Sequence, residues 1–144
     1  MTTSADIVRA ARGWLGTPYV HQASLKGVGT DCLGLVRGVW RDVCGDEPEP
    51  LPAYAPGWAE EGGREDLADA ARRHLAEVPY TEHRAGDVLL FRWRPHLPAK
   101  HAGIAMPDGR MVHAQEGAAV TEIALNRWWL RHLCFAFRFP GVDA

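Results

Sequence analysis

Apolar residues recur every three to four positions in three stretches of the chain, which is the spacing of an amphipathic helix. The predicted helices cover residues 4–15, 32–44 and 64–77. Thr3 or Ser4 can cap the first helix, and Asp31 is a favourable N-cap for the second. Gly45 suits the position that follows the end of a helix, so the bounds of the second helix are the best defined.

Pro79 marks a change to short apolar stretches separated by turn residues, a pattern typical of strands. The predicted strands cover residues 87–93, 101–106, 110–115, 118–125 and 134–139, and one or two helical turns are expected at 126–133. The Pro107-Asp108-Gly109 turn predicts a hairpin between the second and third of these strands. Helices followed by an antiparallel meander predict an α+β fold.

A stretch rich in Pro, Gly and Glu separates the second helix from the third, over residues 46–63. This composition excludes a regular core element. It is interpreted as an excursion at the domain surface. The chain of 144 residues, 1–144, is then expected to form a single domain.

The charge balance excludes several classes of function. Sixteen Lys and Arg oppose eighteen Asp and Glu, for a net charge of −2, so the basic footprint of a nucleic-acid binder is absent. No apolar run approaches the ~20 residues that cross a bilayer, which argues against membrane insertion. The first ten residues lack the basic start and apolar core of a signal peptide, and we expect synthesis in the bacterial cytoplasm.

Cys32 is the strongest candidate for chemistry among the three cysteines. It follows the predicted cap Asp31, and unpaired N–H groups in the first turn of a helix stabilise a thiolate and lower the pKa of a thiol. The alternative is a small buried hydrophobe, and this is the interpretation preferred for Cys44 and Cys134. An odd number of cysteines does not build a disulfide scaffold.

His101 and His113 lie on the two strands of the predicted hairpin, and the parity of the pairing decides whether they share a face. On one face, His101 could serve the thiol of Cys32 as a base while His113 holds its other ring nitrogen. Either histidine could equally be a surface residue. A zinc site on these three residues would lack a clear fourth ligand and any closely spaced ligand pair, so neither a metal nor a cofactor is predicted.

Five motifs, in order, resemble the NlpC/P60 family of cysteine peptidases: G-T-P-Y at 16–19, D-C-L-G-L-V at 31–36, G-D-V-L-L-F at 86–91, H-A-G-I-A at 101–105 and M-V-H-A at 111–114. The nearest likeness is to a compact subgroup encoded by phages and gene-transfer agents, which shares the terminal F-A-F-R-F-P run. Leu33 stands where many members have serine, and Val20 to Ala23 replace a common Trp-Gly-Gly sequence.

The resemblance implies a papain-like core, with a nucleophile at a helix N-terminus packed on an antiparallel sheet. It implies hydrolysis of the peptidoglycan stem peptide, next to D-glutamate or diaminopimelate. Cys32 would be the nucleophile, His101 the general base and His113 the orienting third member. Tyr19 matches a tyrosine beside the catalytic cysteine, and Asp31 matches an aspartate that contacts the amine end of the substrate in some members.

The subgroup implies incorporation in a phage-like particle that acts on the cell wall, with tail or baseplate proteins as partners. Two alternatives to hydrolysis stay open. One is amide transfer or deamidation on the same scaffold. The other is a non-catalytic structural module of a tail hub.

Overall fold

A computed structural model of the chain describes residues 2–48 and 64–142. Most of the surface excursion expected at residues 46–63 lies outside the described residues. None of the helices in the described part of the chain has the length and apolar character needed to cross a membrane.

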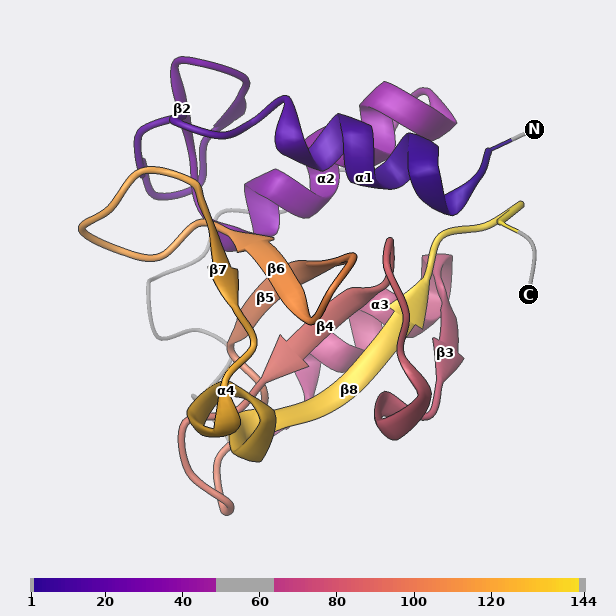
Figure 1. Cartoon of the computed structure of the whole chain (residues 1–144), viewed down its shortest axis with the longest axis vertical. Helices are drawn as coiled ribbons and strands as arrows, with labels where there is room; N and C mark the ends of the chain where they lie inside the picture. Colours follow the sequence, from indigo (N-terminus) through magenta and orange to yellow (C-terminus); the bar gives the residue numbers. More distant parts are fainter. Residues whose placement is uncertain (1, 49–63, 143–144) are drawn as a thin grey trace.

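A six-stranded sheet in the order β3-β8-β4-β5-β6-β7 forms the framework, and every neighbouring pair in it is antiparallel (Figure 1). Its strands are β3 Ala76–Val78, β4 Val88–Phe91, β5 His101–Met106, β6 Arg110–His113, β7 Thr121–Ala124 and β8 Leu133–Arg138. A second, small sheet pairs β1 Ser24–Leu25 with β2 Gly29–Thr30, between the first and second helices.

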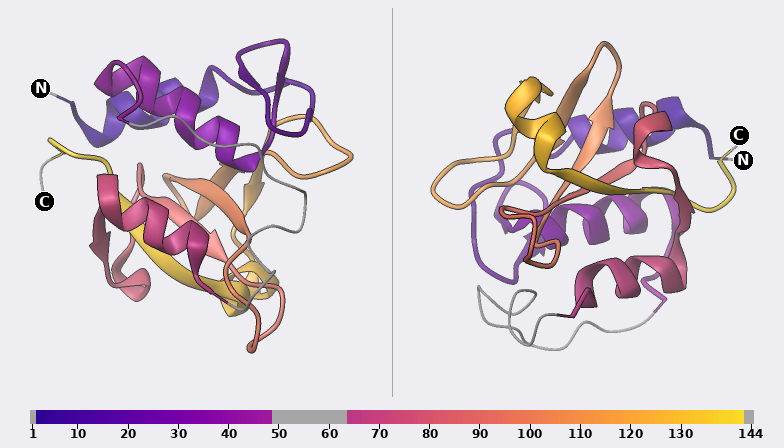
Figure 2. Two further views of the ribbon diagram at one scale, coloured as in Figure 1. Left: turned by 180° about the vertical axis from the view of Figure 1, so that it is seen from behind. Right: turned by 90° about the horizontal axis from the view of Figure 1, so that it is seen from below.

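Within residues 2–48 and 64–142, the α-helices that cover the sheet are α1 Ser4–Arg12, α2 Cys32–Cys44, α3 Asp66–His74 and α4 Arg127–His132. A 3-10 turn, η2, spans Tyr80–Glu82. Figure 1 shows α1 and α2 side by side at one end of the molecule and α4 at the other. Seen from behind, α3 lies across β8 (Figure 2). This architecture confirms the α+β prediction.

The two faces of the sheet bury different clusters. Val88 and Leu90 of β4 pack with α1, α2 and α3, whereas the alternate residues Leu89 and Phe91 pack with Trp129 of α4. Successive side chains of a strand point to opposite faces, so β4, buried at all four residues, serves both clusters. The sheet is therefore a central layer rather than a one-sided surface.

The predicted bounds agree with the structure for α2 and β5 and differ elsewhere. The first helix ends at Arg12 rather than 15, with Thr3 as its N-cap in a capping box with Asp6. The third helix ends at His74, because Ala76–Val78 pair with β8 instead of continuing the helix. That pairing joins segments about 60 residues apart, and helical periodicity alone does not contain it.

Close packing holds α2 in place against α1. A Cβ atom at Gly38 would overlap the indole of Trp14, which lies directly against the α2 backbone at this glycine. The indole nitrogen of Trp14 donates to Asp42 Oδ2 at 3.1 Å, which joins the end of α1 to the far half of α2. Because α2 also packs against β5, its N-terminus has a defined position relative to that strand.

Candidate active site

Asp31 fixes the start of α2. Its Oδ1 accepts a hydrogen bond from the Gly34 backbone N–H at 2.7 Å, and its Oδ2 accepts one from Gln22 at 2.8 Å. The first contact is the predicted N-cap, and the second ties the preceding loop to the same carboxylate. A Cβ at Gly34 would overlap the Ala23 carbonyl, so this glycine is what allows the loop to lie so close to α2.

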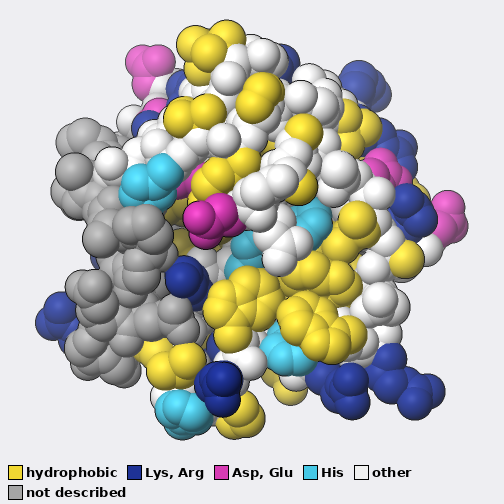
Figure 3. Space-filling model, turned by 90° about the vertical axis from the view of Figure 1, so that its left-hand side faces the viewer, with side chains coloured by type: hydrophobic (Ala, Val, Ile, Leu, Met, Phe, Trp, Pro, Cys, Tyr) yellow, Lys and Arg dark blue, Asp and Glu magenta, His cyan; other side chains and the backbone are white. Residues whose placement is uncertain are grey.

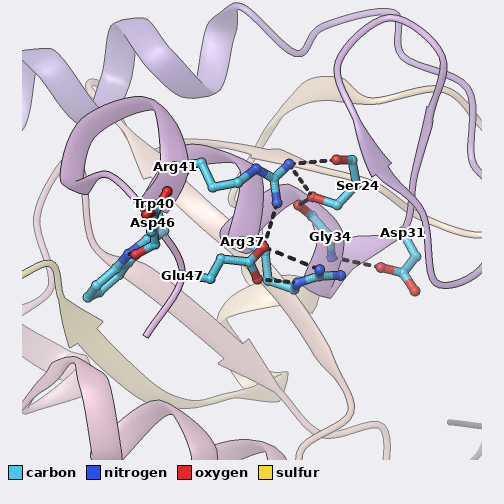
Figure 4. A network of polar contacts seen from close by, with 8 residues as sticks. All are labelled: Ser24, Asp31, Gly34, Arg37, Trp40, Arg41, Asp46 and Glu47. Carbon is cyan, nitrogen blue, oxygen red and sulfur yellow. Dashed lines mark hydrogen bonds and ion pairs between the residues drawn. The ribbon is translucent and has the colours of Figure 1, made fainter. Parts of the chain in front are cut away.

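A second network fastens the same loop to the middle of α2 (Figure 4). Ser24 Oγ donates to the Gly34 carbonyl at 2.6 Å, and Arg41 donates to the Ser24 carbonyl at 2.5 Å. Arg41 and Arg37 both pair with Glu47, at 2.9 Å and 2.6 Å. These contacts hold the segment that carries Tyr19 and Asp31 against the helix that presents Cys32.

The hairpin of β5 and β6 brings His101 and His113 together on one face. Gly103 pairs directly with His113, and His101, two residues earlier on β5, points to the same side of the sheet. Asp108 and Gly109 both have positive φ, 65° and 69°, which is the conformation of a tight hairpin turn and sets this register. His101 Nε2 lies 2.8 Å from His113 Nδ1.

Cys32 lies beside the first residues of β5. Its Sγ is 3.9 Å from the Lys100 carbonyl, and the backbone N–H of Ala102 also interacts with it. His101 stands between these two residues in the sequence. The predicted residues Tyr19, Asp31, Cys32 and His101 line one cavity, and His113, which is only 3% exposed, reaches that cavity through His101.

Burial sets the protonation of the three candidate groups. It raises the pKa of the Cys32 thiol to about 11, against a smaller lowering by nearby backbone N–H groups. Burial lowers the pKa of His101 to about 3, with a contribution from His113, and lowers that of His113 to about 4. The expected lowering of the thiol pKa by the helix N-terminus is therefore outweighed. At neutral pH the site holds a neutral thiol beside neutral imidazoles.

Tyr19 remains protonated over the same range. Burial, with smaller contributions from the nearby groups Cys32, Asp31 and Glu116, raises the pKa of its hydroxyl to about 12. A phenol with this pKa is available as a hydrogen-bond donor at every physiological pH. Its place in the cavity lining lets it donate to a bound carbonyl.

Several further residues complete the cavity. His21, Trp93, Lys100, Gln115 and Glu116 all contribute to its lining. Trp93 and Lys100 belong to the loop between β4 and β5, and Gln115 and Glu116 follow β6. From the sequence, the loop at 92–100 is a candidate wall of the substrate groove and Trp93 a candidate to pack against the substrate. A turn-rich composition does not specify which of the other side chains face Cys32.

Two tryptophans enclose the histidine pair. The Trp93 ring stacks on His101, with centroids 5.4 Å apart and planes at 28°. Trp129 of α4 lies 5.1 Å from His113 and 5.7 Å from His101, and is 8% exposed. Together they exclude water from much of the His101–His113 contact. Figure 3 shows hydrophobic and histidine side chains gathered on this face of the molecule.

A metal centre has no support in residues 2–48 and 64–142. They contain no group of three or more His, Cys, Asp or Glu side chains arranged to hold a metal ion. The chemistry available to the arrangement is that of a thiol next to an oriented imidazole, with backbone N–H groups at a helix N-terminus nearby.

An antiparallel sheet with a cysteine at a helix N-terminus and a histidine pair on the adjoining strands defines a papain-like α+β protein. The sequence profile of the NlpC/P60 family matches residues 16–138, and the chain belongs to this family. Members of the family are generally cysteine peptidases or hydrolases that act on peptidoglycan.

The chain is also similar to a curated protein. The gamma-DL-glutamyl hydrolase of Bacillus subtilis (strain 168) is 27% identical over 142 residues, which are 98% of this chain and 30% of that protein. This chain thus spans about a third of that curated relative.

Solved structures show the same fold. The NlpC/p60 domain of the peptidoglycan hydrolase SagA is 25% identical with a TM-score of 0.65, over 96% of this chain and all 100% of that one. An NlpC/P60 protein from Bacillus cereus ATCC 10987 is 20% identical with a TM-score of 0.67, over 96% of this chain and 40% of that one.

Proposed function

We propose that this protein hydrolyses an amide bond in the stem peptide of peptidoglycan, with Cys32 as nucleophile, His101 as general base and His113 as the residue that orients His101. One observation carries the proposal. Cys32 and His101 line the same cavity, and His101 is hydrogen-bonded at 2.8 Å to a second buried histidine. This is the nucleophile, base and orienting-group arrangement of thiol hydrolases.

The ring nitrogens of His101 have different tasks in this mechanism. With its proton on Nε2, His101 donates to His113 Nδ1, and its own Nδ1 can accept the thiol proton. Because thiol and imidazole are both neutral at rest, proton transfer accompanies attack on the substrate carbonyl. The sulfur–carbon bond forms, and the imidazolium then protonates the departing amine as the carbon–nitrogen bond breaks.

Water completes the cycle. His101 removes a proton from a water molecule, which attacks the thioester, and the thiol is regenerated as the carboxylate product leaves. The oxyanion is stabilised by the Cys32 backbone N–H at the start of α2 and by the Tyr19 hydroxyl. Asp31 contributes to the substrate-binding side of the cavity while it caps the helix.

The names of two relatives support the proposed substrate class. SagA and the gamma-DL-glutamyl hydrolase act, by their names, on peptidoglycan and on glutamyl bonds. We infer that the scissile bond of this chain lies next to D-glutamate or diaminopimelate in the stem peptide. The partners of the protein would be tail or baseplate proteins of a phage-like particle, which carries it to the cell wall; the supporting observation is the F-A-F-R-F-P run shared with the phage subgroup.

Digestion of purified muropeptides tests the proposal. Hydrolysis adds one water and splits the stem peptide, which mass spectrometry separates from amide transfer and from deamidation. Cys32→Ala is expected to lower the rate by at least ~1,000-fold while circular dichroism stays unchanged. Cys44→Ala, which removes a thiol at the other end of the same helix, is the matched control and retains activity. Cleavage by Cys32→Ala at the rate of the Cys44→Ala control would refute the thiol mechanism. A wild-type protein without product would favour the structural-module alternative.

A further inference from the structure

Basic residues concentrate in two segments beside the cavity. Residues 92–100 and 126–133 contain no Asp or Glu, in a chain whose net charge is −2. Their basic residues are Arg92, Arg94, Lys100, Arg127 and Arg131. In Figure 3, Lys and Arg side chains lie along the lower edge of the face shown, below the hydrophobic side chains, whereas Asp and Glu side chains lie in its upper half. The molecule therefore carries a local excess of positive charge.

The two segments lie side by side and adjoin the proposed active site. The Arg92 backbone N–H donates to the His132 carbonyl at 3.0 Å, and the ring centroids of Trp93 and Trp128 are 6.0 Å apart. Trp93 also lines the cavity that contains Cys32. The basic side chains around α4 are therefore continuous with that cavity.

Three of the arginines have no acidic partner in the part of the chain that the structure describes. Arg94, Arg127 and Arg131 are exposed, and no described side chain forms an ion pair or a hydrogen bond with any of them. Arg92, in contrast, pairs with Glu65 at 3.2 Å. We call the surface formed by Arg94, Arg127 and Arg131 the basic surface.

Local stability does not account for the arginines of α4. Arg127 and Arg131 are four residues apart on this helix, and like charges at that spacing repel each other. Arg127 is also the first residue of α4, where the positive end of the helix dipole disfavours a cation. Exposed guanidinium groups of this kind favour an anionic ligand, because each can bind a carboxylate through two parallel hydrogen bonds.

We propose that the basic surface binds polymeric peptidoglycan, through the carboxylates of stem peptides that neighbour the one in the cavity. The inference rests on the proposed function, because it takes a stem peptide as the ligand of the adjoining cavity. Peptides that contain D-glutamate or diaminopimelate carry free carboxylates, and the polymer presents many of them on one molecule. A second attachment beside the cavity raises the effective concentration of the polymer at Cys32 and leaves the catalytic groups unchanged.

The first experiment measures binding without hydrolysis. The Cys32→Ala protein is sedimented with purified peptidoglycan at low ionic strength. Adding Arg127→Glu is expected to weaken binding by about fivefold, because it removes one attraction and adds a repulsion. The difference should shrink as salt is added, since salt screens exposed charges. The variant is expected to fold, because an acidic residue in the first turn of a helix is favourable.

Arg9→Glu is the matched control. It makes the same change in net charge on α1, at the opposite end of the molecule from α4 (Figure 1), and the Arg9 side chain is 75% exposed. Equal affinities for the Arg127 and Arg9 variants, or absence of binding to peptidoglycan, would overturn the inference.

Vesicles of phosphatidylglycerol and phosphatidylcholine test a different anionic partner. If Arg127→Glu abolishes binding to these vesicles and leaves binding to peptidoglycan unchanged, the basic surface serves a membrane and the inference is wrong.

The second experiment uses the active protein on polymeric peptidoglycan and on soluble muropeptide. Arg127→Glu is expected to lower the ratio of their kcat/KM values, polymer over muropeptide, by about fivefold, whereas Arg9→Glu leaves that ratio unchanged. An unchanged ratio in Arg127→Glu would contradict the role of the basic surface. Peptidoglycan binding that depends on Arg127, with no hydrolysis of either substrate, would instead refute only the proposed function.

Discussion

His101 and His113 are joined edge to edge, Nε2 to Nδ1 at 2.8 Å, with their ring planes at 84°. The contact is diagonal across the β5–β6 hairpin, since the residue paired directly with His113 is Gly103. A Cβ at position 103 would lie 3.3 Å from the His113 Cβ, so the absence of a side chain there relieves crowding beside His113. The hydrogen bond therefore fixes the ring of His101 on β5 to a side chain of the neighbouring strand β6.

The two histidines are expected to differ in their effect on the rate. His101→Ala removes the residue that we propose as both base and acid, and it should lower kcat by ~1,000-fold or more, within the range of general acid–base catalysis. His113→Ala removes only the proposed orienting group, and we expect a loss of about 100-fold. His113→Asn should recover part of it, because an amide oxygen can accept the proton on Nε2. Muropeptide turnover measures all three, and a greater loss in His113→Ala than in His101→Ala would contradict these roles.

Trp129 is expected to keep water from the histidine pair. Trp129→Leu opens that contact, so the pKa values of His101 and His113, measured by NMR titration of the ring protons, should rise toward 6.5. Trp128→Leu is the control and should leave both values in place, because Trp128 makes no ring contact with either histidine. Equal shifts in the two variants would show that the buried tryptophan has no shielding role.

Acid is expected to destabilise the fold through the same pair. In the folded protein the pKa values of His101 and His113 are about 3 and about 4, below the ordinary value of 6.5. At a pH between the folded and the ordinary value, the unfolded chain therefore binds more protons than the folded chain. The free energy of unfolding is therefore unaffected by these residues above pH 6.5. It falls as the pH drops from there toward 4, by up to ~1.4 kcal/mol per pH unit for each histidine.

Urea denaturation between pH 7.5 and 4.5 measures this slope. His113→Gln, which keeps a polar side chain but does not titrate, should flatten it. If the free energy of unfolding of His113→Gln falls with pH as steeply as that of the wild type, the acid sensitivity arises from other groups.

A buried ion pair joins Asp87, the residue before β4, to Arg138 at the end of β8; these residues belong to the G-D-V-L-L-F and F-A-F-R-F-P motifs. Both Asp87 oxygens accept hydrogen bonds from Arg138, each at 2.9 Å, and Asp87 is only 1% exposed. Arg138→Met would leave the carboxylate buried without its ion-pair partner, with the Arg84 backbone N–H still donating to it at 3.0 Å, at a cost of ~3–5 kcal/mol in the free energy of unfolding. The exposed pair of Arg72 and Glu77 is the control, and Arg72→Met there should cost less than ~1 kcal/mol. Similar costs for the two variants would contradict this account.

Local patterns determined much of the architecture. The cap Asp31, the apolar spacing and Gly45 placed α2 at Cys32–Cys44, and the Pro107-Asp108-Gly109 turn placed the hairpin with β5 at His101–Met106. These features are encoded within a few residues of where they act, because a cap or a tight turn depends on backbone groups close in sequence. The α+β class followed from the order of these elements.

Tertiary structure decided what depended on distant segments. Pairing with β8 placed Ala76 and Glu77, the end of the helix expected at 64–77, in strand β3, and the register of β5 with β6 put both histidines on one face. The position of Cys32 at a helix N-terminus predicted a lowered pKa for its thiol. Burial beside β5 raised that pKa instead. Packing of α4 brought Trp129 onto the histidine pair and left Trp128 exposed. Burial and long-range pairing are properties of the whole fold, so a local pattern specifies which residues are available for chemistry and the fold specifies their surroundings.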